Sequence, residues 1–221
     1  MGLITQYGFH HASEMEDGEA IFTKELTPPP GLDPEPVELA QRFYPSVYDG
    51  DAVNKFIVPV RPQYHEQLFT SYRFHRSAEK DSRKIGSEGN AIKKAYLTHS
   101  NTKKVSEGDV LLFYRSRDDM AVTSLGVCET VHLRLTDAER IKRIVGKRTV
   151  YTDAQIEKFA EKPTTVFMFT WHFDLPNPVS YEVLTDEGIL RGGPQSPTEI
   201  SNQDYMKIKQ RGEIDGRFTF D

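Results

Sequence analysis

The sequence predicts an α+β fold in which a curved β-barrel is flanked by short helices and preceded by an N-terminal β-hairpin. Short β-branched and aromatic runs alternate with short helical segments, which is typical of such a barrel. The pair Asp17-Gly18 separates two short strands and is a strong hairpin signal. Five prolines between positions 27 and 36 exclude a regular helix or central strand there. We therefore expect a hairpin over residues 1–26, a proline-rich acidic linker over 27–54 and the barrel domain over 55–221.

The elements of the barrel domain follow from local patterns. Residues 55–60 are apolar and β-rich and predict a strand, and Pro62 then begins a short helical segment that reaches residue 69. Residues 92–97 are expected to be helical, and 110–114 and 122–133 to be strands. Thr136-Asp137 and Thr152-Asp153 are capping sequences that begin helices to about residues 145 and 160. A strand over 164–173, a short element over 179–184 and a helix over 201–208 complete the domain.

Composition narrows the protein class. The chain has 221 residues, a net charge of −5 and a single cysteine, which cannot form an internal disulfide. No stretch approaches the ~20 apolar residues that a membrane span needs, and the N-terminus lacks the features of a signal peptide. These observations indicate a cytoplasmic protein. Cys128 lies in a predicted strand, and we interpret it as a small core residue rather than a nucleophile.

The charge is unevenly distributed along the chain. Residues 1–60 carry 3 basic and 10 acidic side chains, a balance of −7, whereas residues 61–117 carry 12 basic and 6 acidic ones, a balance of +6. Binding of a polyanion depends on the field at the contact surface and not on the total charge. The middle segment therefore permits nucleic-acid binding, although a basic solvated face explains the same count.

The sequence contains no pattern that assembles a catalytic or metal site. The seven histidines are scattered, without a Cys-x-x-Cys or His-Glu-x-x-His motif to support zinc. A P-loop, a Gly-x-Gly-x-x-Gly motif and a nucleophile elbow are also missing. We expect no metal, no cofactor and no catalytic residue.

Features that suit binding are better represented. A basic segment, residues 89–97, leads through Gly108-Asp109 into a strand that ends in Phe113 and Tyr114, which point to opposite faces. Trp171 ends an aromatic strand and is the aromatic residue nearest a possible pocket. In the loop after Leu190, the amide of Gln195 suits a base edge, although a structural loop explains this stretch equally well.

Residues 56–208 resemble the PUA-like superfamily, in particular its EVE-type branch, which is related to the ASCH and YTH domains. The residues that carry the resemblance are Lys55 to Pro62 with Tyr64-His65 and Leu68-Phe69, Gly89 to Ile92, Ala95 to Leu97, Gly108-Asp109 through Phe113-Tyr114, Gly126-Val127, Gly192 to Ser196 and Ile200-Ser201.

The resemblance implies a curved, partly closed barrel that binds RNA or DNA, with or without a modified base held in an aromatic pocket. Candidate ligand-binding residues are Arg61, Tyr64, His65, Asn90, Lys93, Lys94, Tyr96, Lys103, Lys104, Phe113, Tyr114, Trp171, Gln195 and Ser196. The four lysines are expected to contact phosphates. The others are expected to form the pocket, with only one of Phe113 and Tyr114 in it, because these two point to opposite faces.

Two other functions stay open. The chain also looks like the type in which such a module follows a GNAT-type acetyltransferase domain, with residues 7–9 and 18–24 matching its last strands. The pyrophosphate-binding loop of that family is missing, so this chain alone is not expected to bind acetyl-CoA. A barrel that binds a small molecule is the third possibility, and the basic balance of residues 61–117 disfavours it mildly.

Overall fold

The computed structural model describes residues 3–29, 35–72 and 91–221. Its strands are β1 (His10–Glu14), β2 (Ala20–Thr23), β3 (Val47–Tyr48), β4 (Lys55–Val60), β5 (Lys93–Thr98), β6 (Val110–Arg115), β7 (Ala121–Leu135), β8 (Thr164–Ser180), β9 (Thr198–Ile200) and β10 (Thr219–Phe220). Its α-helices are α1 (Leu3–Gln6), α2 (Pro36–Arg42), α3 (Pro62–Leu68), α5 (Ala138–Val145), α6 (Asp153–Ala160), α7 (Tyr181–Asp186) and α8 (Asn202–Arg211), and short 3-10 helices lie at Gly146–Arg148 and Gly216–Phe218.

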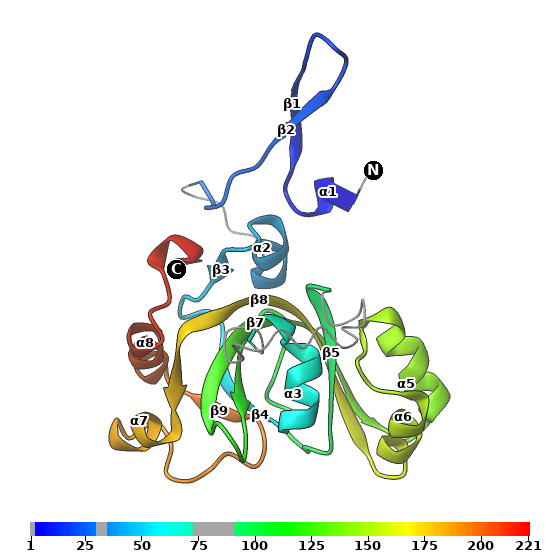
Figure 1. Ribbon diagram of the computed structural model, residues 1–221, viewed down its shortest axis with the longest axis vertical. Helices are drawn as coiled ribbons and strands as arrows, with labels where there is room; N and C mark the ends of the chain where they lie inside the picture. Colours follow the sequence, from blue (N-terminus) through cyan, green and yellow to red (C-terminus); the bar gives the residue numbers. More distant parts are fainter. Residues whose placement is uncertain (1–2, 30–34, 73–90) are drawn as a thin grey trace, which may run out of the picture.

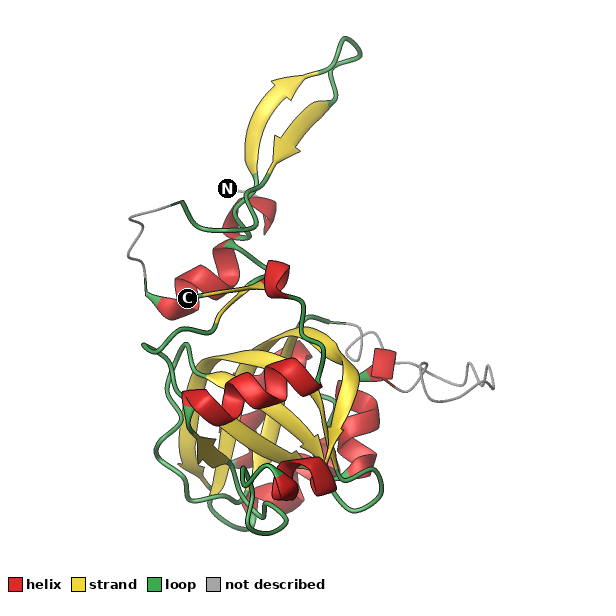
Figure 2. Ribbon diagram, turned by 90° about the vertical axis from the view of Figure 1, so that its left-hand side faces the viewer, coloured by secondary structure: helices red, strands yellow, loops and turns green. Residues whose placement is uncertain are grey.

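The predicted N-terminal hairpin is confirmed. Strands β1 and β2 pair antiparallel around the turn that contains Gly18, whose φ of +85° favours glycine. All residues of both strands are exposed, and the hairpin extends away from the rest of the chain in both ribbon views (Figures 1 and 2). The hairpin therefore contributes little to the core.

The main body is a six-stranded mixed sheet with the order β5-β8-β7-β6-β4-β9. Strands β4 and β6 are parallel, and the other neighbours are antiparallel. The long strands β7 and β8 curve strongly (Figure 1). Among the described residues no ladder joins β5 to β9, so the curved sheet is open, whereas the sequence predicted a partly closed barrel.

Two clusters of apolar side chains pack on opposite faces of this sheet. The first contains Phe56 and Phe113 together with residues of α3, α5 and α6. The second contains Ile57 and Tyr114 together with residues of α2, α7 and α8. Phe113 and Tyr114 thus point to opposite faces, as the period of two predicts.

The stretch 27–54 was predicted to be an extended linker, but its described part includes α2 and β3. Leu39, Phe43 and Val47 are buried there, and β3 pairs with β10 at the C-terminal end of the chain. Pro36 begins α2, where its missing N–H needs no partner. The position of the domain boundary stays a prediction.

Two other elements differ from the sequence predictions. Residues 93–98 form the edge strand β5 instead of a helix, because pairing with β8 outweighs the helix propensity of the Lys-Lys-Ala sequence. Strand β8 continues to Ser180, beyond the predicted end at residue 173, and the Ser180 hydroxyl caps α7. No helix in the described part of the chain has the length and apolar character needed to cross a membrane.

Candidate nucleic-acid interface

A groove with a volume of about 300 Å³ lies where α3, β5 and α6 meet. Its lining residues are Arg61, Gln63, Tyr64, Tyr96, Leu97, Thr98, His99, Gln155, Lys158 and Phe159. Arg61 precedes α3 because Pro62 fixes the first helical position. Three candidates from the sequence, Arg61, Tyr64 and Tyr96, therefore come together in one groove.

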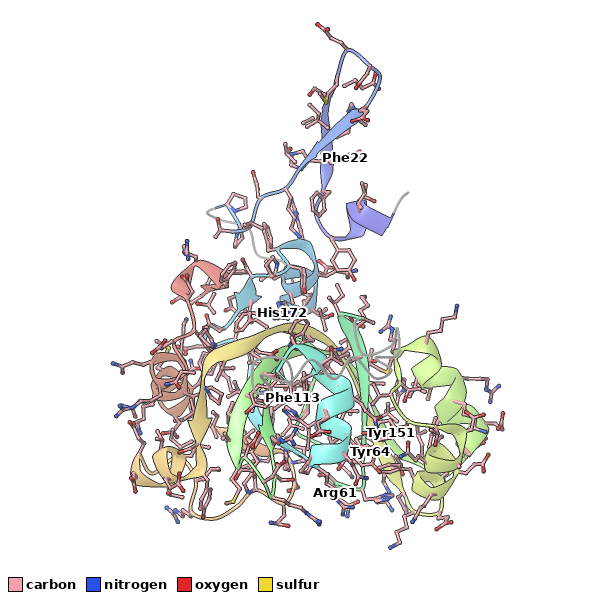
Figure 3. All side chains as sticks on the ribbon, viewed as in Figure 1. Phe22, Arg61, Tyr64, Phe113, Tyr151 and His172 are labelled. Carbon is pink, nitrogen blue, oxygen red and sulfur yellow. The ribbon has the colours of Figure 1, made fainter. Side chains whose placement is uncertain are left out.

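Aromatic rings form one wall of the groove. The Tyr64 ring lies 4.7 Å from the Tyr151 ring and 6.0 Å from the Phe159 ring, and the His99 ring lies 5.1 Å from that of Phe159. Figure 3 shows Tyr64, Tyr151 and Arg61 at the same end of the molecule, far from the hairpin. Tyr64 and Phe159 are half-buried, so part of each ring is available to a ligand.

The hydroxyls of Tyr96, which lines the groove, and of the buried Tyr151 both form hydrogen bonds. The Tyr96 hydroxyl donates to the carbonyl of Pro59 at 2.7 Å, and the amide of Leu97 donates to the Tyr151 hydroxyl at 3.3 Å. Burial raises the pKa of both tyrosines, so both stay protonated at neutral pH.

Basic side chains border the groove. Arg61 and Lys158 are exposed, and neither forms an ion pair within the residues that the structure describes. No carboxylate is found among the described residues that line the groove. The groove therefore offers cations and aromatic faces, which suits an anionic ligand that carries planar rings.

A wider, shallow hollow of about 740 Å³ continues from the groove and shares Thr98 and His99 with it. Lys104, Gln195 and Ser196 line this hollow. The Gln195 amide donates to the Gly193 carbonyl at 3.2 Å, so its loop is partly held in place. The groove and the hollow together contain six of the predicted site residues.

The four candidate phosphate-binding lysines differ in their surroundings. Lys93 forms an ion pair with Glu129 at 3.0 Å, and Lys104 forms one with Glu199 at 2.7 Å. Lys103 is exposed and has no ion pair among the described residues, whereas Lys94 is buried. Lys103 is thus the most available of the four to a phosphate.

Glu129 holds Lys93 in a small network. Its carboxylate accepts hydrogen bonds from Thr170 at 2.7 Å and from Arg148 at 2.6 Å. Burial alone would raise the pKa of Glu129, but hydrogen bonds from Thr170 and Lys93, with the charges of Lys93 and Arg148, lower it below its usual value. Glu129 is therefore ionised and competes with a phosphate for Lys93.

Other candidates lie in a polar cluster between α3, β7 and β8. The Asp174 carboxylate accepts from Ser124 at 2.7 Å, from the Trp171 indole at 3.3 Å and from Ser71. The Ser124 hydroxyl lies 3.2 Å from that of Thr123, which lies 2.7 Å from Nε2 of His65. Burial, together with the nearby Arg115 charge, lowers the pKa of His65 to about 3, so His65 is neutral at pH 7. Trp171 and His65 hold the fold together at this point.

Lys94 contacts the same cluster. Its ammonium lies 5.9 Å from the centre of the Trp171 ring. Burial lowers the pKa of Lys94 to about 8, and the Asp174 charge opposes this effect. Lys94 is therefore a buried cation beside Asp174 and the Trp171 ring, and it belongs to this polar cluster and not to the groove.

The remaining candidates do not reach the groove. Phe113 is fully buried, with its ring 4.8 Å from that of Phe69 and 4.5 Å from that of Phe169. Tyr114 is buried on the opposite face. Both therefore belong to the core and not to a ligand wall. Asn90 lies outside the described residues, and no cluster of His, Cys, Asp or Glu that could hold a metal occurs in the described ranges.

Sequence reasoning missed the contribution of α6 and the segment before it. Gln155, Lys158 and Phe159 line the groove, and the buried Tyr151 ring packs against the Tyr64 ring. The helix itself was predicted from the Thr152 cap, and the spacing of Gln155 from Thr152 is a capping-box signal. The sequence did not show which side of α6 faces Tyr64, because that depends on tertiary packing.

Comparison with known proteins was made by sequence and by structure. No family model and no curated protein matches the chain. Among solved structures, the ASCH protein from Zymomonas mobilis matches with a TM-score of 0.54 and 13% identity, covering 71% of this chain and 94% of that protein. Two single-residue variants of that protein match with 12% identity and TM-scores of 0.53 and 0.54, covering 71% of this chain and 94% and 96% of theirs.

The chain has an ASCH-like fold. This finding agrees with the coarse part of the fold prediction, and it does not support the predicted EVE-type branch or a link to an acetyltransferase domain. At this identity the likeness concerns the fold alone. In this chain the groove lies beside α3, where β4 and β5 end.

Proposed function

We propose that this chain binds single-stranded nucleic acid, with one unstacked base in the groove between α3, β5 and α6. The observation that carries the proposal is a single groove that combines an aromatic wall with Arg61 and Lys158 and has no carboxylate among its described lining residues. Single strands are bound in this way, by stacking of bases on aromatic faces and by cations along the backbone.

The two hollows suggest a path for the strand. A base enters the groove and packs on the exposed parts of Tyr64 and Phe159, while Arg61 and Lys158 contact its phosphates. The neighbouring nucleotides continue over Thr98 and His99 into the shallow hollow, where Lys104 and Gln195 lie. The groove volume of about 300 Å³ is at the lower end of the range for ligand pockets, which suits one nucleotide and not a duplex.

The proposal extends to a modified base. A methyl group on a pyrimidine adds apolar area that an aromatic wall buries favourably. Reading of a modified base, as in the EVE-type modules that the sequence resembles, is therefore a finer form of the same function.

Fluorescence anisotropy tests the proposal with single- and double-stranded RNA and DNA oligonucleotides, with and without 5-methylcytosine, at two salt concentrations. We expect single strands to bind more tightly than duplexes, with an affinity that falls as salt rises. Arg61→Ala and Lys158→Ala should each weaken binding and reduce its salt dependence. Lys162→Ala, which changes an exposed lysine outside the groove, is the matched control. Affinity that does not respond to salt, or none for any oligonucleotide, would refute the proposal.

A second candidate function rests on the hairpin. Its exposed apolar side chains, among them Met15, Ile21 and Phe22, are what the last strands of a larger domain would present to their neighbours. We therefore retain the proposal that the chain is the C-terminal portion of a GNAT-type acetyltransferase whose barrel recruits the substrate. Calorimetric titration of acetyl-CoA into the chain should give no heat, whereas binding would mean that a cofactor site exists here.

A further inference from the structure

The Gln155 side chain has a fixed orientation at the edge of the groove. Gln155 is the third residue of α6, and its Oε1 accepts a hydrogen bond from the backbone N–H of Thr152 at 2.9 Å. In return, the backbone N–H of Gln155 donates to the Thr152 hydroxyl at 3.3 Å. Only the oxygen of an amide can accept from an N–H. The capping box therefore determines which end of the amide remains available.

The NH2 group of the Gln155 amide is the part that remains available to a ligand. Gln155 Nε2 carries two N–H donors, and neither has a partner in the described part of the chain. Gln155 is half-buried and lines the groove. A ligand that enters the groove thus meets a donor at this position, and the amide cannot rotate to present its oxygen without breaking the helix cap.

The charged groups that line the groove are also hydrogen-bond donors only. The Arg61 guanidinium and the Lys158 ammonium have N–H groups and no acceptor. Carboxylates, which are acceptors only, do not occur among the described lining residues. The charged groups of the groove therefore favour a ligand that presents acceptors to them.

Nucleobases fall into two classes by this criterion. Guanine and uracil carry an exocyclic carbonyl oxygen, which accepts a hydrogen bond, where adenine and cytosine carry an exocyclic amine, which donates. An exocyclic amine opposite Gln155 Nε2 would leave donors facing each other without an acceptor, which costs binding free energy. We propose that Gln155 makes the groove selective for keto bases, guanine and uracil, by donating from Nε2 to the exocyclic carbonyl. This inference rests on the proposed function and specifies its substrate class.

The test uses two pairs of oligonucleotides that differ in one base: inosine against adenosine and uridine against cytidine, each at the centre of an otherwise identical single strand. In each pair, the first base has a carbonyl oxygen where the second has an amino group. We expect the full chain to bind the keto member about tenfold more tightly by anisotropy, since a well-placed base contact discriminates by this order.

The variant Gln155→Glu separates the donor from the helix cap. Its carboxylate still accepts from the Thr152 N–H, so α6 keeps its capping box, but an acceptor replaces the amine. We expect the keto preference to disappear or to invert, with an unchanged melting temperature. Ala154→Glu adds the same charge at an exposed neighbouring position outside the groove; it should weaken both members of each pair equally and keep the preference.

The possible failures are distinguishable. Salt-dependent binding without a keto preference in the unmodified chain overturns this inference and leaves the proposed function standing. A keto preference that survives Gln155→Glu assigns the selection to another residue and also overturns it. If no oligonucleotide binds at all, the proposed function fails, and the inference fails with it.

Discussion

Helix α3 carries two adjacent aromatic residues, one accessible to a ligand and the other buried and hydrogen-bonded. Tyr64 faces the groove, where part of its ring is open to a ligand and the neighbouring Arg61 has no ion pair in the described structure. His65, the next residue, is buried against Thr123 and connects through it to Asp174. The sequence nominates both residues for binding on the same grounds. The difference teaches that hydrogen-bonding capacity left over after folding, and not residue type, marks a binding surface.

The sharpest test of this comparison removes the acceptor at the centre of the buried cluster. Asp174→Asn takes a charged acceptor from Ser71, Ser124 and Trp171 and leaves Lys94 facing a neutral group. We expect the free energy of unfolding in urea to fall by about 3 kcal/mol. Asp186→Asn, at an exposed position, should change it by less than about 0.5 kcal/mol. Equal effects at the two positions would contradict the assigned role of the cluster.

Acid should lower the stability of the folded chain through its buried histidines. Burial lowers the pKa of His65 to about 3 and that of His172 to about 4, both below the value near 6.5 of an unfolded chain. Between these values the unfolded chain binds protons that the folded chain does not, so stability falls as the pH drops below about 6.5.

The loss should reach about 2 kcal/mol for each of these two histidines by pH 5. Urea denaturation from pH 7 to pH 5 measures it. His65→Gln and His172→Gln should each flatten the pH dependence. A dependence that no buried-site variant alters would show that other groups cause it.

In the groove, the ring of Tyr64 should matter for binding more than its hydroxyl. Tyr64→Ala removes a stacking face and should weaken single-strand binding by about 1.5 kcal/mol, while Tyr64→Phe keeps the ring and most of the affinity. Anisotropy titrations of both variants, beside thermal melts, distinguish a binding effect from a folding one. A large loss in Tyr64→Phe would assign the contribution to the hydroxyl instead.

The smallest expected effect compares two adjacent lysines. Lys103 has no ion pair in the described structure, whereas Lys104 is paired with Glu199 at 2.7 Å. Lys103→Ala should therefore reduce the slope of log affinity against log salt by about 0.7, the value for one phosphate contact with a single strand. Lys104→Ala should reduce the slope by less. If Lys104→Ala reduced the slope more than Lys103→Ala, the phosphate backbone of the nucleic acid would have to lie nearer Glu199.

Local signals predicted the helices of this fold well. Asp137 and Thr152 cap α5 and α6 as the sequence indicates, because each cap depends on residues within one turn. The helix predicted over residues 92–97 was wrong. Residues 93–98 form strand β5 there, because they pair with residues of β8 about 70 positions later. Long-range pairing of this kind leaves no local trace.

The candidate site was predictable only where local signals place its residues. Tyr64 and Arg61 were found because they follow a recognisable strand and begin a helix at Pro62. Phe113 was nominated as a ligand wall but lies in the core, since its burial depends on Phe69 and Phe169 from other elements. Gln155 and Phe159 were missed, because only tertiary packing brings α6 to the Tyr64 side of the groove.

The length of strand β8 has a consequence for cooperativity. Over Thr164–Ser180 it pairs with β5 on one side and with β7 on the other, and it contributes Phe167 and Phe169 to one core cluster and Leu175 and Val179 to the other. Neither cluster can open without breaking a ladder that the other depends on. The two halves should therefore melt in one calorimetric transition, and their slowest-exchanging amides should report the same opening free energy.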